Sequence, residues 1–132
     1  MSNTALRAAT AYRATQVESR SQLELVVLLY DGLVRFLTEG REAIARRDLH
    51  AKRTAIARGL AILGHLQSTV DRDRGGDIAV QLLSLYGYIS RRIVDANVKL
   101  DVEPLDEALR LIAPLRDAWT EIAAARTAKS TA

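Results

Sequence analysis

Residues 23–37 read LELVVLLYDGLVRFL and carry large apolar side chains at all but four positions. Within this stretch, apolar residues recur at alternating spacings of four and three. Such heptad spacing places them along one face of a helix and predicts that this face packs against other helices. The stripe consists of Leu23, Val27, Tyr30, Val34, Leu37 and, one heptad later, Ile44.

The same periodicity predicts three further helices. We expect helices over about residues 21–47, 49–70, 77–100 and 104–128. Residues 71–76, DRDRGG, are predicted to be a loop, because paired glycines and four charges offer nothing to bury. Pro104 suits a first helical turn, whereas Pro114 lies inside the fourth helix and predicts a local kink.

Apolar stripes on these three helices complete the predicted core. In the second helix the stripe is Leu49, Ile56, Leu60, Leu63, Leu66 and Val70. In the third it is Ala79, Leu82, Tyr86, Ile89, Ile93, Ala96 and Leu100, and in the fourth it is Leu105, Ala108, Ile112, Leu115, Trp119 and Ile122.

The composition agrees with an all-α fold. Of 132 residues, 21 are Ala and 19 are Leu, both strong helix formers, and only two are Pro. Short connections make successive helices antiparallel. We therefore predict an antiparallel up-down-up-down four-helix bundle over residues 21–128, with a short N-terminal arm (1–20) and a frayed tail (129–132).

Few features point to chemistry. The chain has no Cys, which excludes disulfides and thiolate chemistry. His50 and His65 lack the Glu-x-x-His spacing of di-iron bundles, and no Ser has a plausible His and acid at hand. We expect no catalysis, no cofactor and no metal. We also find no signal peptide and no membrane-spanning run, which favours the cytosol.

The net charge of +3, with 16 of the 19 basic residues Arg, leaves nucleic acid as an alternative partner. The basic residues of the second helix and its loop form only a modest stripe. That stripe has no interleaved aromatic residues, and nearby Asp71 and Asp73 dilute it. A solvated face is the favoured interpretation.

Two helices carry more apolar residues than one core-facing stripe needs. The first adds Leu25, Leu28, Leu29, Gly32 and Phe36, and the third adds Val80, Leu83, Leu85 and Tyr88. A four-helix bundle cannot bury these extra faces by itself. The N-terminal arm, a second copy of the chain or a bound partner could cover them.

Several blocks, in order along the chain, resemble one family. They are Ala11-Tyr12, Val17, Ser21-x-Leu23, VLLYDG (27–32), GGDIA (75–79), Leu85-Tyr86-x-Tyr88, Arg91-Arg92, Asp95-Ala96-Asn97 and LRDAW (115–119). Together they resemble the flagellin-specific export chaperones of bacteria, the FliS family. The chain departs from the family pattern at Arg20-Ser21, Gln81 and Gly87, where the family often has Pro, Asn and Asp.

The resemblance implies a cytosolic helical bundle that binds the disordered C-terminal segment of flagellin. It would prevent premature polymerisation and deliver the client to the flagellar type III export gate, a second expected partner. We expect no nucleic acid, no membrane insertion, and a monomer or weak homodimer when free. The predicted partner-binding residues are Tyr12, Val17, Leu25, Leu28, Leu29, Asp31, Gly32, Phe36, Leu83, Leu85, Tyr88, Arg92 and Asn97. For Asp31 and Asn97, bonding between helices within the bundle is an equal alternative.

Overall fold

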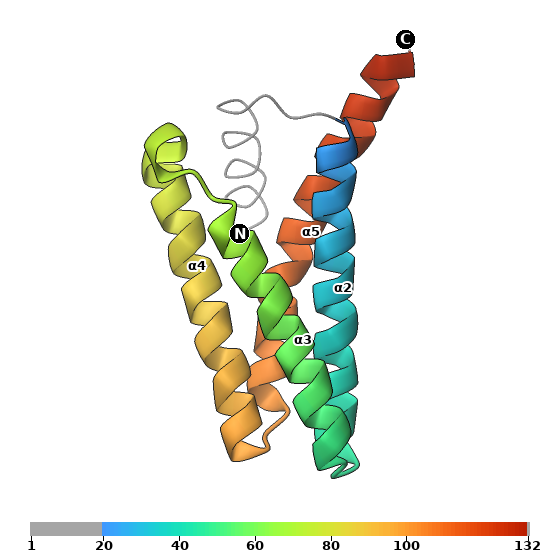
Figure 1. Cartoon of the computed structure of the whole chain (residues 1–132), viewed down its shortest axis with the longest axis vertical. Coiled ribbons are helices and arrows are strands. Elements are labelled where there is room, and N and C mark those ends of the chain that lie inside the picture. The colour runs from blue at the N-terminus through green and yellow to red at the C-terminus, as the bar shows by residue number, and fades with distance from the viewer. Residues whose placement is uncertain (1–19, 132) are drawn as a thin grey trace.

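Four long helices make up the structure, a computed structural model that describes the backbone of residues 20–131 and the side chains of residues 22–125. The helices are α2 (Arg20–Ala45), α3 (Leu49–Ser68), α4 (Arg72–Lys99) and α5 (Glu103–Thr131), and the described residues form no strand. Successive helices run in opposite directions (Figure 1). The predicted all-α up-down-up-down bundle is therefore confirmed.

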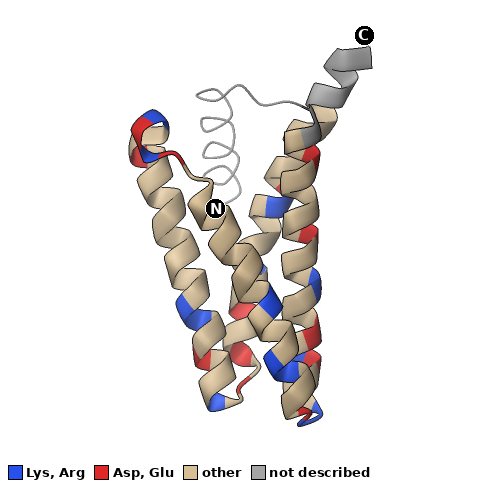
Figure 2. Ribbon diagram, in the orientation of Figure 1, with Lys and Arg blue, Asp and Glu red and all other residues tan. Residues whose placement is uncertain are grey.

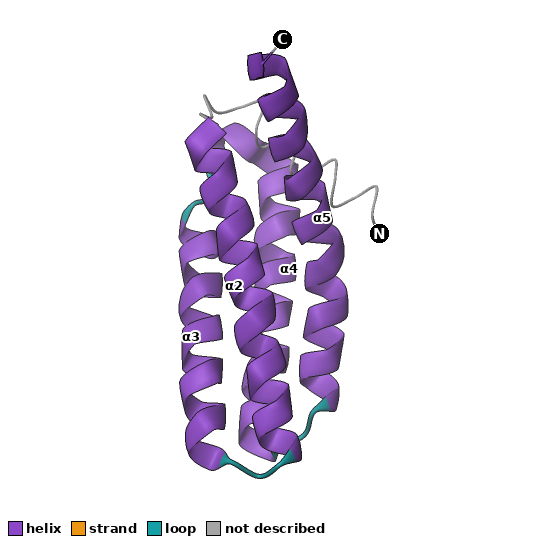
Figure 3. Cartoon of the chain, turned by 90° about the vertical axis from the view of Figure 1, so that its right-hand side faces the viewer, coloured by secondary structure: helices purple, strands orange, loops and turns teal. Residues whose placement is uncertain are grey.

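The four helices pack in a ring in which each contacts two neighbours. α2 packs on α3 and α5, and α4 packs on the same two helices from the opposite corner. Figure 3 shows α2 and α5 side by side, with α4 behind them. None of the described helices is both long and apolar enough to cross a membrane. Below, the upper half is the half that holds the α3–α4 connection, as in Figure 1, and the lower half holds the other two connections.

Most of the predicted core is buried. The stripes of α4 and α5 are buried along their whole length except at Leu100, which is 45 % exposed. On α2, Leu33 is fully buried, whereas the predicted Val27 and Val34 are only partly buried. The heptad pattern misses Leu33 because the buried face of α2 is wider than one stripe. Leu49 is 49 % exposed because it begins α3 at the end of the bundle.

A polar group lies inside the upper half of this core. The Tyr30 hydroxyl forms hydrogen bonds with the Tyr86 hydroxyl and with the Trp119 side chain. These residues come from α2, α4 and α5 and are 0 %, 3 % and 4 % exposed. Burial raises the pKa of Tyr30 to about 12, so it stays neutral. A buried hydroxyl without a hydrogen-bond partner would destabilise the fold, so these bonds satisfy the hydroxyls and also join three helices.

The prediction that residues 71–76 form a loop is wrong for most of that segment. Helix α4 begins at Arg72, because the Asp71 side chain accepts a hydrogen bond from the Arg74 N–H over 3.1 Å and caps the first turn. Local capping stabilises this turn although Arg72, Asp73 and Arg74 stay exposed. The turn joins the rest of α4 at Gly76, whose φ of 55° and ψ of −132° suit only glycine.

Two helices end at residues other than glycine with left-handed backbones. Arg47 follows α2 with φ 61°, and Leu100 follows α4 with φ 53°. The amide of Asp48 donates to the carbonyl of Ala43, and that of Asp101 donates to the carbonyl of Ala96, as in a Schellman motif. The left-handed conformation costs an ordinary residue about 1–2 kcal/mol.

Candidate functional site

The extra apolar residues of α2 lie on one face of the helix, and their exposure changes along it. Leu25 and Leu28, in the first turns, are 53 % and 65 % exposed. Leu29 packs partly against the core. Two large apolar side chains therefore stand open to solvent at the upper end of α2, directly above residues that contact α3.

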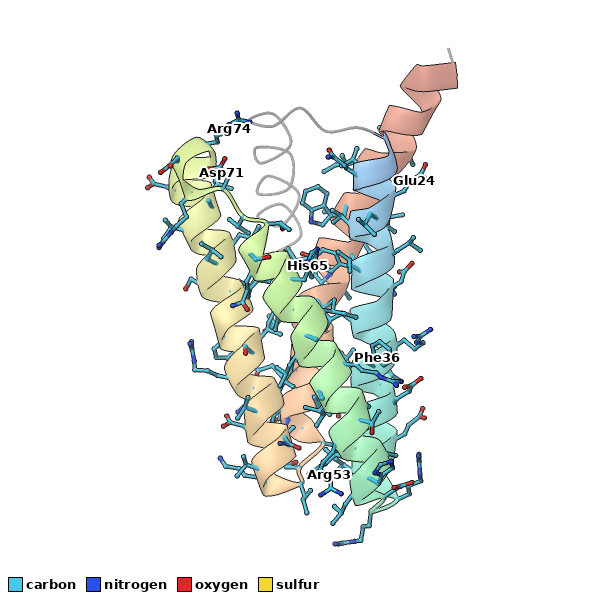
Figure 4. All side chains as sticks on the ribbon, in the orientation of Figure 1. Glu24, Phe36, Arg53, His65, Asp71 and Arg74 are labelled. Carbon is cyan, nitrogen blue, oxygen red and sulfur yellow. The ribbon has the colours of Figure 1, made fainter. Side chains whose placement is uncertain are left out.

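Gly32 and Phe36 lie where this face meets α3. A Cβ atom on Gly32 would come within 3.1 Å of the Ile62 Cδ1 atom, so the small residue lets α3 approach closely. The Phe36 ring lies beneath two guanidinium groups, with the Cζ atoms of Arg35 and Arg58 at 4.6 and 5.7 Å from its centroid. Figure 4 shows Phe36 between α2 and α3. Both residues belong to the α2–α3 contact, and Phe36 is covered by cations.

The four residues predicted on α4 do not share one face. Leu83 and Leu85 are two positions apart, which is about 200° around a helix, so they point to different sides of α4. Tyr88 is 38 % exposed and, with Arg92, points toward α5. Leu83 therefore lies on a different side of α4 from Leu85, Tyr88 and Arg92. Leu83 and Leu85 are both partly buried.

Tyr88 and Arg92 form an α4–α5 clamp with Glu103 and Glu107. The Tyr88 hydroxyl donates to both Glu107 oxygens, at 3.0 and 2.9 Å. The Arg92 guanidinium binds Glu107, Glu103 and, within α4, Asp95. The hydrogen bonds from Tyr88 and Arg92 lower the pKa of Glu107, and the bond to Glu107 raises the pKa of Tyr88. The clamp was absent from the sequence prediction, which treated Tyr88 and Arg92 as client contacts.

The two predicted polar contacts differ in how far they are engaged. Asp31 is exposed and lies 3.9 Å from the Arg116 guanidinium of α5, a weak ion pair between helices. The Asn97 Oδ1 atom is buried and has no hydrogen-bond partner among the described residues. Tyr12 and Val17 lie outside the described residues.

Charge is distributed unevenly over the bundle. Residues 59–70 of α3 and its connection and residues 78–90 of α4 include no Asp, Glu, Lys or Arg. Figure 2 shows these neighbouring segments as tan stretches in the upper half, below the charged α3–α4 turn. The exposed Leu25 and Leu28 lie in the same half. The upper half thus combines exposed apolar side chains on α2 with neutral segments of α3 and α4.

The comparisons with known proteins agree with this arrangement. Residues 4–126 match the family described as Flagellar protein FliS. The chain belongs to the FliS family. One relative, the flagellar secretion chaperone FliS of Salmonella typhimurium, is 32 % identical over 117 residues, which cover 85 % of this chain and 87 % of the relative.

Two other relatives lead to the same family. The flagellar secretion chaperone FliSB of Pseudomonas aeruginosa is 30 % identical over 89 % of this chain and 97 % of the relative. The FliS chaperone of Bacillus subtilis is 30 % identical over 85 % of this chain and 83 % of its own length. These FliS-family relatives are named as chaperones of flagellar secretion and not as enzymes. Within the described residues, no group of three or more His, Asp or Glu could hold a metal ion.

Proposed function

We propose that this FliS-family chain is a cytosolic chaperone that binds the C-terminal segment of flagellin. It would keep flagellin from polymerising early and bring it to the flagellar export apparatus. The chain acts by binding and carries out no catalysis. The observation that supports this proposal most is the open apolar stripe of Leu25 and Leu28 on a bundle of the flagellar chaperone family.

The physical chemistry of the upper half suits an unfolded client. An amphipathic segment that folds on binding offsets its ordering entropy by burying apolar surface. Leu25 and Leu28 provide that surface, and the neutral segments of α3 and α4 extend it without requiring matched charges. Leu29, Gly32 and Phe36 provide the floor of this surface, where α2 meets α3.

The remaining predicted residues take different parts in the proposal. Leu83 and Leu85 belong to the neutral stretch of α4 and lie on different sides of that helix. Tyr88 and Arg92 hold α4 against α5 and so keep that surface in place. Asp31 orients the client at the edge, and Tyr12 and Val17 are arm residues that yield to it.

Isothermal titration calorimetry tests this proposal. The protein is titrated with a peptide of the flagellin C-terminal segment, and a scrambled peptide of the same composition serves as the control. We expect one-to-one binding of the native peptide alone, and equal heats from the two peptides would contradict the proposal. Sedimentation with and without the peptide then shows whether the free chain is a monomer or a weak homodimer.

A further inference from the structure

The lower end of the bundle has an apolar surface that is separate from the proposed client site. A cavity of about 310 Å³ is lined there by Ile44, Ala45, Arg47, Leu49 and Leu100. Leu49 and Leu100 are 49 % and 45 % exposed. We call these five residues the end patch. They come from the α2–α3 and α4–α5 connections and adjoining helix ends, opposite the end where α2 begins (Figure 1).

The backbone at the end patch is unfavourable in two places. Arg47 and Leu100 are the only non-glycine residues with positive φ in the described part of the chain, and both line the same cavity. Glycine is the residue that this helix-end position favours. The chain gives up backbone stability at both connections and places a large side chain on the patch each time. Strain of this kind concentrates where a surface has a function.

A buried polar contact lies one helical turn behind the end patch. Lys52 is 8 % exposed, and its Nζ atom donates to the Asn97 carbonyl over 3.4 Å. Lys52 is three residues from Leu49, and Asn97 is three residues from Leu100. The contact joins α3 to α4 within one helical turn of the two exposed leucines.

The charges around the end patch are unbalanced. Both acidic residues of the connections are engaged: Asp48 caps α3 and lies near Arg46, and Asp101 accepts from the Glu103 amide. Arg47, Arg53 and Lys99 form no ion pair with any described residue. Figure 4 shows Arg53 at this end of the bundle. Asp48 and Asp101 keep their negative charge, but Arg46, Arg47, Arg53 and Lys99 outnumber them, so the rim of the patch is basic on balance.

We propose that the end patch docks a short amphipathic helix of a partner protein, with an apolar side chain in the cavity and acidic residues against the basic rim. The cavity is at the lower limit of ligand-binding volumes, about 300 Å³, so it suits one or two side chains and not a folded face. A second copy of this chain fits poorly, because it would bring Arg47 and Lys99 against like charges. The client site at the other end stays free for flagellin.

The test uses the full-length protein and synthetic peptides of about 15 residues, long enough for a marginal helix. One peptide carries leucines on one face flanked by glutamates, and its partner carries lysine at each glutamate position. Fluorescence anisotropy measures binding of each. We expect the acidic peptide to bind, and the lysine peptide to bind about ten-fold more weakly or worse. Equal binding of the two peptides, or none by either, would overturn the proposal.

Variants locate the peptide on the protein. Leu49→Glu should weaken binding of the acidic peptide about ten-fold, whereas Leu28→Glu at the client site should leave that binding unchanged. Leu100→Gly should raise the melting temperature, because glycine relieves the left-handed backbone, and should still weaken peptide binding. That variant separates lost binding from lost folding.

Three outcomes would contradict the placement at the end patch. If Leu28→Glu weakened binding of the acidic peptide as much as Leu49→Glu, the peptide would be bound at the client site. If Leu100→Gly bound the peptide as tightly as the wild type, Leu100 would not be part of the peptide-binding surface. A wild-type dimer in sedimentation that Leu49→Glu dissociates would make the patch a contact between two copies of this chain. Each result is independent of whether flagellin binds at the other end.

Discussion

The upper and lower halves of the bundle are held together by different interactions. In the lower half, ion pairs cross between helices: Arg41 binds Asp106, and Arg92 binds Glu103 and Glu107. In the upper half, the Tyr30–Tyr86 hydrogen bond and apolar packing join the helices, and Asp31 and Arg116 form a weak ion pair between α2 and α5. If a client binds over the neutral segments of α3 and α4, as we propose, few charges there need to be desolvated.

The largest expected effect separates the buried core from the exposed apolar residues. Ile89→Ala removes a side chain that is 0 % exposed, and it should lower the free energy of unfolding by about 2–5 kcal/mol. The matched variant Val94→Ala, on the same helix and 43 % exposed, should change it by less than about 0.5 kcal/mol. Urea denaturation measures both. Similar losses in the two variants would mean that α4 is rotated about its own axis, so that Val94 is buried as well as Ile89.

The next effect concerns client binding by the upper half. Leu28→Glu places a charge on a side chain that is 65 % exposed, so the bundle should stay folded. Binding of the flagellin peptide should weaken by about 2 kcal/mol, roughly 30-fold, as at an interface hot spot. Leu49→Glu at the lower end is the control and should bind normally. The halves would not differ in function if both variants lost the peptide equally.

Two glycines of α3 should respond in opposite directions. Gly64 has no atom within 4 Å of an added Cβ, so Gly64→Ala should stabilise the helix by about 0.5–1 kcal/mol. Gly59 is buried, and its Cβ would lie 3.0 Å from the Leu37 Cδ2 atom. Gly59→Ala should therefore cost about 1 kcal/mol. Thermal unfolding followed by circular dichroism compares them, and a gain in both variants would show that α2 and α3 are less closely packed.

The smallest effect concerns the α4–α5 clamp and pH. The pKa of Glu107 is lowered in the folded state, so its contribution to stability is present above the ordinary glutamate pKa of about 4.3 and is lost as the pH falls below it. The melting temperature of the wild type should thus fall more steeply on acidification than that of Glu107→Gln. Parallel curves would show that the clamp contributes nothing at neutral pH.

Most of the fold could be predicted from the sequence because apolar spacing on a long helix reports its buried face. Every residue predicted to form the apolar stripes of α4 and α5 is buried except Leu100, and Trp119 is in the core as expected. Capping and rotation about a helix were harder. The Asp71 cap extends α4 through charged residues that have no apolar pattern. The Tyr88–Glu107 bond depends on how α4 is turned toward α5, which spacing alone does not determine.

The candidate site was predicted in part for the same reason. The extra apolar residues of α2 share a face because they all lie on one helix, where spacing alone determines the face. Leu25 and Leu28 are exposed on it. The predicted α4 residues come from two sides of that helix, and Tyr88 and Arg92 contact α5. The end patch carries little signal in the sequence, because its residues meet only when two connections far apart in the chain come together.

Backbone chemical-shift mapping with the flagellin C-terminal segment tests the central claim most directly. If the charge-poor upper half holds the client, the shifts should concentrate on Leu25, Leu28 and the neutral segments of α3 and α4, and Leu49 and Leu100 should stay unchanged. Shifts confined to the lower end, around Leu49 and Leu100, would contradict the claim and would assign the client to the end patch.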